Sequence, residues 1–259
     1  MAAEALSPPA EWRDYRPARD ALAGRVILVT GATAGIGRAV ARALAAHGAT
    51  LLLHGRSAKK LEELYQELAP IGPEPAVAEL DLERAQGPQY QALTEEIEKR
   101  YGRLDGLLHN AGVLGDLSPI EHYDIGVWQR VLLVNLTAPF ILTRCLLPLL
   151  RKSADASVLF TTSSVGNRGR AFWGAYAVSK FGTEGLAQVL ADELESTPIR
   201  VNSINPGATR TGMRARAYPA ENPETLPAPD ALTLPYLYLL GPAACGVRGQ
   251  RIDAQPRAR

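Results

Sequence analysis

The sequence predicts one α/β domain, a doubly wound parallel sheet with helices on both faces. Short apolar runs alternate with longer stretches of helical periodicity along most of the chain. Strand–helix–strand units of this spacing form right-handed crossovers between parallel strands. No repeat, linker or low-complexity tract divides the 259 residues, and this length is ample for one large core.

The apolar runs have the near-continuous hydrophobic character of strands that are buried on both faces. The first run, Arg25–Thr30, is bounded by Gly24 and Gly31. The predicted strands are Arg25–Thr30, Thr50–His54, Pro75–Leu80, Leu104–His109, Ser157–Thr161, Arg200–Ile204 and an extended piece near Gln250–Asp253.

The stretches between these runs have the period and the composition of helices. Gly35–His47 is rich in strong helix formers, and Gly48 ends it. The further predicted helices are Ala58–Leu68, about Tyr90–Tyr101, two adjoining stretches over about Ile125–Leu150, Ala175–Leu194 and Asp230–Leu240.

Two segments fall outside this alternation. Residues 1–22 form a polar, proline-containing extension before the domain of residues 23–259. We expect this extension to pack across a neighbouring subunit or to be disordered, and we assign it no function. Residues 212–229 contain four prolines and few apolar side chains. Long loops inside compact domains are usually functional, so this segment is a predicted substrate lid.

The composition excludes several classes of protein. The formal net charge is +1, whereas a protein that binds nucleic acid through phosphate contacts needs a basic surplus. Residues 1–22 lack the apolar core of a secretory signal, and the longest apolar run, Pro139–Leu150, is too short to span a bilayer. We therefore expect a cytoplasmic protein with no membrane or nucleic-acid partner, and we assign no residue as a metal ligand.

A glycine-rich turn, TGATAGIG, joins the first strand to the first helix at residues 30–37. Gly31 permits the tight turn, Gly35 lets backbone approach a pyrophosphate, and Gly37 lets helix and strand pack closely. The start of the helix offers free N–H groups to the anion. This Rossmann-type arrangement predicts dinucleotide binding, although a glycine turn can also be purely structural. The predicted contacts in the turn are Gly31, Thr33, Ala34, Gly35, Ile36 and Gly37.

The end of the second strand bears on which dinucleotide is bound. No carboxylate stands at positions 54–58, where one would bind the ribose 2′-hydroxyl of NAD(H) and repel a 2′-phosphate. Arg56 can instead bind that phosphate with two N–H groups, with Ser57 as a neutral helper. The prediction is NADP(H) in preference to NAD(H). In the alternative interpretation, Arg56 only caps the turn into the next helix.

The order and spacing of several motifs resemble those of the short-chain dehydrogenase/reductase family. The resemblance covers about residues 24–253, and a nearer likeness to a group of bacterial oxidoreductases includes LHNAG, GAYA-x-SKF-x-TEG and DAQP. The motifs that carry the family resemblance are TGATAGIG at 30–37, Asn110-Ala111-Gly112, Asn135, Ser163, Tyr176-Ala177-Val178-Ser179-Lys180 and Pro206-Gly207.

Tyr176 and Lys180 stand four residues apart in a predicted helix, so they share one face. A free phenol has a pKa of about 10, and a close cation favours its ionised form, which makes Tyr176 a usable general acid–base. The resemblance implies that Lys180 also binds the nicotinamide ribose.

Ser163 and Asn135 complete the predicted catalytic group. Ser163 ends a strand thirteen residues before Tyr176, and the resemblance implies that it binds the substrate oxygen. Its alternative role is to cap the strand, in which case Ser164 is the fallback. Asn135 matches the asparagine of a water relay behind Lys180. A purely structural role for Asn135 is the alternative, because a buried amide needs a partner.

The resemblance also implies further cofactor contacts. Asp81 resembles the acid that contacts the adenine, with Leu82 beside the ring, and His109 stands where the family usually has an asparagine. We interpret His109 as a buried, hydrogen-bonded core residue. The other implied contacts are Asn110 and Gly112, in the turn after the fourth strand, and Pro206, Gly207, Thr209 and Thr211, which hold the nicotinamide carboxamide.

These residues together predict an NADP(H)-dependent oxidoreductase that acts on a small carbonyl or alcohol. A non-catalytic NADP(H)-binding sensor or scaffold on the same fold is the alternative. An epimerase or dehydratase is disfavoured, because its usual glycine spacing is absent. Phe172 and Trp173 are candidates for an aromatic pocket wall. Arg168 and Arg170 either bind a substrate carboxylate or lie at a subunit contact.

The resemblance also implies a homodimer or homotetramer. In the family, the helices that correspond to Asn135–Leu150 and Ala175–Leu194 form one of the interfaces. The hydrophobic repeat of the second helix fits either a core or an interface.

Overall fold

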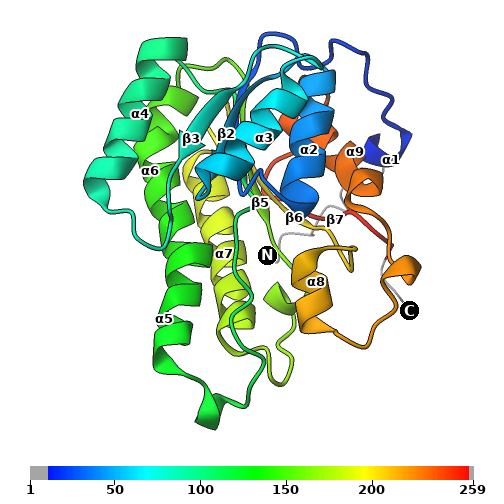
Figure 1. The fold of residues 1–259 in the computed structure, drawn as a ribbon. Coiled ribbons are helices and arrows are strands. Elements are labelled where there is room, and N and C mark those ends of the chain that lie inside the picture. The colour runs from blue at the N-terminus through cyan, green and yellow to red at the C-terminus, as the bar shows by residue number, and fades with distance from the viewer. Residues whose placement is uncertain (1–10, 257–259) are drawn as a thin grey trace, which may run out of the picture.

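One parallel sheet runs through the molecule. In the computed structural model, which describes residues 11–256, seven strands are paired in the order β3-β2-β1-β4-β5-β6-β7 (Figure 1). The strands are β1 (Val26–Thr30), β2 (Thr50–Gly55), β3 (Ala76–Glu79), β4 (Gly106–His109), β5 (Ala156–Thr161), β6 (Ile199–Asn205) and β7 (Arg251–Asp253). This order confirms the predicted doubly wound α/β fold.

The strand order reverses between β1 and β4. The chain runs outward from β1 to β3 at one edge of the sheet, and then returns to place β4 on the other side of β1. Ligands of open parallel sheets bind at such a switch point, beyond the carboxyl ends of the strands. The fold therefore places the ends of β1, β2, β4 and β5 around one crevice.

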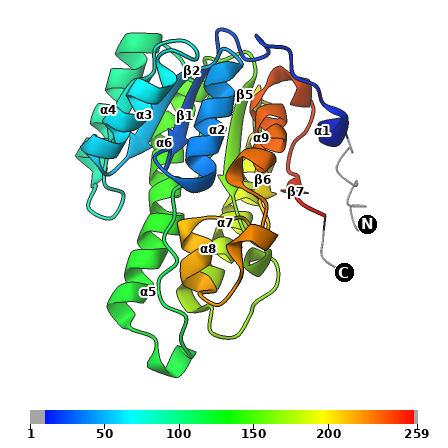
Figure 2. The same cartoon turned by 45° about the vertical axis from the view of Figure 1, so that its right-hand side comes forward.

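Helices cover both faces of the sheet (Figures 1 and 2). α2, α3 and α9 pack on one face, while α4, α6 and α7 pack on the other. The helices of the described residues are α1 (Glu11–Asp14), α2 (Gly35–Ala46), α3 (Ala58–Leu68), α4 (Gly87–Tyr101), α5 (Ile125–Leu132), α6 (Ala138–Leu150), α7 (Gly174–Glu193), α8 (Gly212–Ala217) and α9 (Thr233–Leu240).

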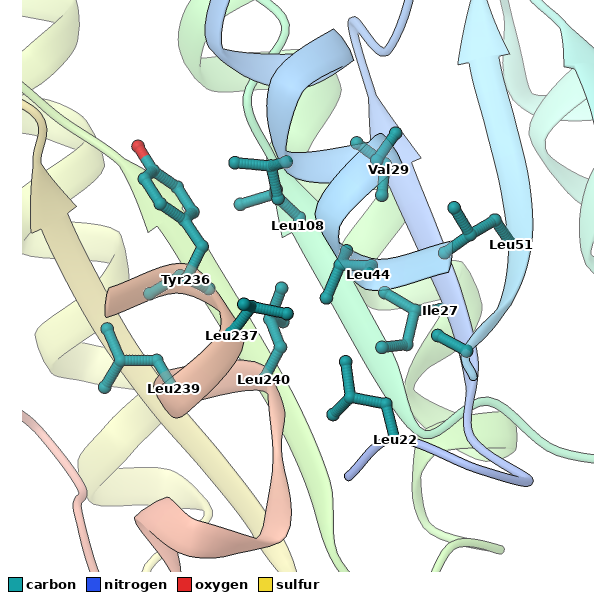
Figure 3. Close-up of a cluster of buried hydrophobic side chains, with 14 of the residues drawn as sticks. Leu22, Ile27, Val29, Leu44, Leu51, Leu108, Tyr236, Leu237, Leu239 and Leu240 are labelled. Atoms are coloured by element: carbon teal, nitrogen blue, oxygen red, sulfur yellow. The ribbon is translucent and has the colours of Figure 1, made fainter. Parts of the chain in front are cut away.

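Each face of the sheet has its own apolar core. Side chains of β1 alternate between them, so Ile27 and Val29 point toward α2 and α9, whereas Leu28 points toward α6. Figure 3 shows the first core, in which Leu44 of α2 and Leu237 of α9 meet these strand residues. Burying one such side chain stabilises the folded state by roughly 2 kcal/mol. Because both cores contain many such side chains, the sheet is a rigid support for the crevice.

The segment before β1 packs on its own chain. Trp12 and Leu22 are buried, and the Tyr15 ring meets Tyr238 of α9 edge to face with centroids 5.5 Å apart. Our expectation that this extension crosses to a neighbour or is disordered is therefore wrong for residues 11–22. Residues 1–10 lie outside the described part of the chain.

The two helical stretches predicted over 125–150 form one continuous run, in which η2 (Leu133–Thr137) is a π-helical turn between α5 and α6. By length and composition alone, this run of 26 residues, whose most apolar 18-residue window has a mean hydropathy of 1.7, could cross a membrane, so the apolar stretch is longer than the 139–150 run considered above. Its most apolar window is 44% buried within the fold, where α6 packs on α4 and α5 packs on α7. A core helix has the same composition, so this observation is weak evidence for a membrane.

Candidate active site

The glycine turn between β1 and α2 has no room for side chains. Gly31 has a φ of 64°, and a Cβ there would lie 2.8 Å from the Cα of Ala111. A Cβ on Gly37 would overlap the carbonyl of Gly31 and the side-chain amide of Asn110. The backbone of the turn therefore lies directly against the start of α2, as the binding of a pyrophosphate at a helix N-terminus requires.

The hydroxyl of Thr30 ties this turn to the loop after β4. Thr30 Oγ1 donates to the carbonyl of Leu108 (3.1 Å) and accepts from the backbone N–H groups of Asn110 (2.9 Å) and Ala111 (3.1 Å). Asn110 and the glycine turn thus form one unit at the switch point. The sequence analysis gave Thr30 no role, although it stands first in the quoted TGATAGIG motif.

The predicted adenosine end of the site lies at the carboxyl ends of β2 and β3. Arg56 is exposed, and among the described residues it takes part in no ion pair. Ser57 is the N-cap of α3, where its hydroxyl accepts from the N–H of Lys60 (3.5 Å). The helix is therefore capped by Ser57, and the guanidinium of Arg56 is left available for a ligand.

The acid at the end of β3 is partly engaged within its own turn. The Asp81 carboxylate accepts from the N–H of Glu83 (3.0 Å) and lies 3.8 Å from Arg84, while Leu82 beside it is buried. The N–H of Leu80 donates to Gly55 at the end of β2 (3.0 Å). This bond brings the predicted adenine-contacting pair next to the end of β2.

Tyr176 and Lys180 lie one above the other on the first turns of α7. The Lys180 ammonium is 5.7 Å from the centre of the Tyr176 ring and donates to the carbonyl of Thr161 at the end of β5 (2.7 Å). Both side chains are buried, at 8% and 5% exposure. The predicted pair is therefore held together beside the carboxyl edge of the sheet.

Burial sets the protonation of both groups. Burial raises the pKa of Tyr176 to about 12, and a hydrogen bond with Ser163 offsets this only in part. Burial also lowers the pKa of Lys180 to about 8, against the opposing charge of Glu184. The expectation that the nearby cation lowers the pKa of the phenol is therefore wrong for this structure, because the desolvation of the phenol dominates its pKa. The phenol is therefore protonated at neutral pH, which suits a proton donor.

Ser163 stands beside Tyr176, as its spacing predicts. It is the N-cap of η3 (Ser164–Gly166), and its hydroxyl accepts from the N–H of Val165 (3.5 Å) as well as bonding with the Tyr176 hydroxyl. Ser163 is partly exposed, and its hydroxyl has both a structural partner and the Tyr176 hydroxyl within hydrogen-bond reach. Ser164 is exposed and is not involved in this bond.

The side-chain amide of Asn135 is hydrogen-bonded within the protein through both its nitrogen and its oxygen. Its amide nitrogen donates to the carbonyl of Val113 (2.9 Å) and to Ser179 Oγ (3.0 Å), and its oxygen accepts from the N–H of Val113 (2.8 Å). This is the partner set that a buried amide needs. The side chain thus joins η2, the loop after β4 and the catalytic helix.

The segment after β6 is held by a residue that the sequence analysis did not single out. The amide nitrogen of Gln255 donates to the carbonyls of Pro206 and Ala208, both at 2.8 Å, while Thr209 is buried. The signal was present, because Gln255 is the third residue of the quoted DAQP motif. Thr211 lies 3.3 Å from where a Cβ on Gly35 would be, so this segment borders the glycine turn.

The predicted lid, 212–229, is not a loop throughout, because it begins with α8. Met213 and Ala217 of α8 pack against the apolar cluster of Leu114, Val165 and Tyr176. Hollows of about 270 and 400 Å³ flank α8, and Tyr176 lines neither of them. The predicted lid therefore packs against the cluster that contains Tyr176.

Aromatic and arginine side chains join the lid to the segment before α7. The Trp173 ring lies between Tyr176 (5.7 Å between centroids) and Tyr218 (5.9 Å). Arg170 donates to the hydroxyl of Tyr218 (2.5 Å), and Arg214 lies 3.8 Å over its ring. Arg170 is thus engaged with the lid, whereas Arg168 is exposed and Phe172 points its ring into solvent.

His109 has the surroundings of a core residue. Its Nε2 lies 2.8 Å from Thr143 Oγ1, and its ring stacks on Phe160 with centroids 4.7 Å apart. Burial, followed by the charges of His54 and Lys180, lowers the pKa of His109 to about 3. The imidazole is therefore neutral at physiological pH.

A parallel sheet with a glycine-turn crevice at its switch point, and with a buried Tyr-Lys pair at the same edge, is the arrangement of an oxidoreductase of the Rossmann type. The family model for short chain dehydrogenase matches residues 25–222. The chain belongs to this short-chain dehydrogenase family.

Several relatives match over nearly the whole chain. The uncharacterized oxidoreductase YciK of Escherichia coli (strain K12) is 49% identical over 243 residues, which is 93% of this chain and 96% of YciK. A short chain dehydrogenase structure from Pseudomonas syringae is 55% identical, has a TM-score of 0.92, and covers 93% of this chain and 99% of its own.

A third relative was solved with a cofactor. The short chain dehydrogenase from Shigella flexneri 2a, in complex with NADP, is 48% identical, has a TM-score of 0.90, and covers 92% of this chain and 100% of its own. The predicted nearer likeness to a group of bacterial oxidoreductases is confirmed by YciK.

Proposed function

We propose that the protein is an NADP(H)-dependent reductase or dehydrogenase that interconverts a carbonyl and an alcohol. The observation that carries this proposal is the convergence of Ser163, Tyr176 and Lys180 at the same sheet edge as the glycine turn. The turn fits a dinucleotide, because the absence of side chains at Gly31 and Gly37 lets its backbone pack closely against Ala111, Asn110 and the start of α2. Bound NADP(H) would supply or accept the hydride.

The side chains divide the remaining work. In the reductive direction, the hydroxyls of Ser163 and Tyr176 hold the carbonyl oxygen, and Tyr176 gives its proton to the forming alkoxide. A phenol whose pKa is about 12 is fully protonated at neutral pH and ready for this step. Lys180 favours the resulting phenolate, and with Asn135 behind it helps to restore the proton.

NADP(H) is the proposed cofactor rather than NAD(H). Arg56 is exposed at the end of β2 and has no carboxylate partner among the described residues, so it is free to bind a 2′-phosphate. The Shigella flexneri relative bound to NADP supports the same choice. The other proposed contacts are those predicted for the turn, for Asp81 and Leu82, and for the loop that Gln255 holds.

The proposed substrate is a small carbonyl compound or alcohol. The proposed cell compartment is the cytoplasm. The side chains that pack with Tyr176 are apolar: Leu114, Val165 and Met213 belong to or pack against its cluster, and the Trp173 ring lies 5.7 Å from its ring. This lining supports an apolar substrate.

A homodimer or homotetramer is also part of the proposal. Four large apolar side chains on α6 and α7 are about half exposed and have no cover in the single chain. They are Phe140 (48%), Val178 (45%), Phe181 (45%) and Val189 (55%).

The test separates an enzyme from a non-catalytic NADP(H)-binding sensor. NADPH and NADH are titrated by fluorescence, and a panel of carbonyl compounds is assayed with the wild type and with Tyr176→Phe. The enzyme predicts substrate-dependent NADPH oxidation that Tyr176→Phe abolishes while NADPH still binds. Normal turnover by Tyr176→Phe would refute the assigned mechanism. Failure of the wild type to bind NADPH would refute the proposed function.

A further inference from the structure

A buried carboxylate stands one helical turn beyond Lys180. Tyr176, Lys180 and Glu184 are spaced by four residues, so all three lie along one face of α7. Glu184 is 7% exposed. Its Oε2 accepts from Ser203 Oγ on β6 (2.6 Å), and its Oε1 accepts from Nε of Arg251 on β7 (2.9 Å).

Arg251 connects this carboxylate to the rest of the site. Besides Glu184, its guanidinium donates to Asp253 Oδ1 (2.9 Å), and it reaches the backbone carbonyl of Ser163 (3.4 Å). Asp253 also accepts from Asn205 at the end of β6 (2.9 Å). One guanidinium thus links α7, β7 and the residue proposed to bind the substrate oxygen.

We propose that Glu184 and Arg251 are positioning residues, which act through Lys180 and Ser163: Glu184 keeps the ammonium of Lys180 charged within the fold, and Arg251 fixes both Glu184 and the Ser163 carbonyl. The proposal rests on the function above for its catalytic meaning. The proposed function assigns neither Glu184 nor Arg251 a direct contact with the substrate or the cofactor.

The reason lies in the cost of burying a charged ammonium. Lys180 has one direct partner, the neutral carbonyl of Thr161, so its charge is poorly compensated by hydrogen bonding alone. Glu184 is the compensating charge on the same helix, and it opposes the effect of burial on the pKa of Lys180. A neutral Lys180 would no longer favour the ionised phenol of Tyr176.

The other charged and titratable groups around Lys180 do not replace Glu184. Tyr176 is protonated, and His109 on β4 is neutral because burial holds its pKa at about 3. On β7, Arg251 and Asp253 are paired with each other. Glu184 is therefore the carboxylate of α7 nearest to Lys180 along the helix, and although it is paired with Arg251 it opposes the effect of burial on the Lys180 pKa.

The signs of the two expected effects are opposite. Removing the Glu184 charge makes the ammonium harder to keep, so the Lys180 titration moves to lower pH. Removing the Arg251 charge takes a cation away from Glu184, so the Lys180 titration moves to higher pH. A role that is only structural would lower stability in both variants and would not separate them by sign.

The experiment is a pH titration of Lys180 in the full-length protein, labelled with ¹³C at the ε carbon of lysine. Lys180 is the buried member of five lysines, and its signal is assigned by its loss in Lys180→Met. The other four, all exposed, are Lys59, Lys60, Lys99 and Lys152.

Glu184→Gln is expected to lower the midpoint of the Lys180 titration by about one pH unit, a tenfold loss of charge in the affected range. Glu184→Asp keeps the charge and is expected to stay closer to the wild type than Glu184→Gln does. Arg251→Met is expected to raise the midpoint. The matched control is Ser203→Ala, which removes one hydrogen bond of Glu184 but no charge, so it lowers stability and leaves the midpoint in place.

An unchanged midpoint in Glu184→Gln, or a lowered midpoint in Arg251→Met, would overturn the proposal. If Glu184→Gln does not fold, the sign found for Arg251→Met still decides the matter. The titration needs no substrate, so its failure is distinct from a failure of the proposed function, which the Tyr176→Phe assay reads separately.

Discussion

Asn135 of η2 donates a 3.0 Å hydrogen bond to the hydroxyl of Ser179, which in turn donates to the carbonyl of Tyr176 (2.7 Å). These two hydrogen bonds connect the π-helical turn to Tyr176. Asn135→Ala leaves Ser179 and both backbone groups of Val113 without this partner in a buried place. We expect a loss of about 3 kcal/mol in the free energy of unfolding, measured by urea denaturation.

The control for this prediction is Ser179→Ala. It removes one partner of Asn135 and keeps both bonds with Val113, so its loss of stability is expected to be smaller. An equal loss in the two variants would contradict the dominant role of Asn135.

The buried histidines predict sensitivity to acid. Burial lowers the pKa of His54 to about 4 and, with the charges of His54 and Lys180, the pKa of His109 to about 3. Both values lie below the unfolded value of about 6.5, so the folded state binds fewer protons than the unfolded state between these limits. Their contribution to stability is complete above pH 6.5 and is lost as the pH falls toward 4.

The measurement is urea unfolding at about pH 7.5 and about pH 5, where each histidine is expected to cost about 2 kcal/mol of stability at the lower pH. His54→Gln should reduce the acid loss by this amount. The exposed His122 provides the control, because His122→Gln should leave the acid loss as it is in the wild type. Equal acid losses in the wild type and in His54→Gln would rule out this origin.

Arg56 is expected to decide the choice between NADPH and NADH. In Arg56→Asp, a carboxylate replaces the exposed guanidinium and repels a 2′-phosphate, so NADPH affinity should fall about tenfold or more while NADH affinity is retained. Fluorescence titration with each cofactor measures this. Arg151→Asp introduces the same change of charge after α6, at the amino edge of the sheet, and should not alter the preference. An unchanged preference in Arg56→Asp would leave Arg56 with no role at the cofactor.

Phe172 adopts a left-handed backbone conformation, with a φ of 72°, while its side chain is exposed. Its carbonyl accepts from the N–H of Ser118 (3.0 Å), which holds this turn in place before α7. Side chains disfavour such a φ, so Phe172→Gly is expected to be about 1 kcal/mol more stable than Phe172→Ala in urea denaturation. Comparing these two variants removes the effect of losing the ring, and equal stabilities would show that the backbone carries no strain there.

The sequence predicted the sheet well because buried parallel strands are nearly continuous apolar runs between glycines or turns. α7 was predicted as Ala175–Leu194 and is found at Gly174–Glu193. α4 begins at Gly87, earlier than the predicted Tyr90, because a capping box of Gln86 and Gln89 starts the helix ahead of its apolar residues. Predicted helix 230–240 opens instead with the 3₁₀ turn η5 (Pro229–Leu232).

Short elements that tertiary contacts stabilise could not be predicted in the same way. α8 has six residues, and its stability depends on Thr211 at its N-cap and on packing over Tyr176. α1 has four residues and packs on α9. Neither has enough turns to show a hydrophobic period.

The residues of the candidate site also fall into two groups: those whose role could be predicted from the sequence and those whose role could not. Residues in motifs, such as Tyr176 and Lys180, could be named from their spacing because one helix fixes their geometry. Glu184 and Gln255 stand in quoted motifs as well, but their hydrogen-bond partners, like those of Arg251, lie far away in the sequence on other elements, so their roles could not be predicted from spacing. The pKa of Tyr176, which the nearby cation led us to expect below its usual value, is instead raised to about 12, because the phenol is buried and spacing does not reveal burial.

The two hydrogen bonds from Gln255 to the loop at 206–208 also affect the order in which the site is completed during synthesis. The glycine turn, α7 and the first six strands leave the ribosome before Gln255 does. Domains fold as units during translation, so a nascent chain can build most of the sheet while this loop still lacks its two amide bonds. The loop at 206–208 can therefore take up these two bonds only after the last strand has been made.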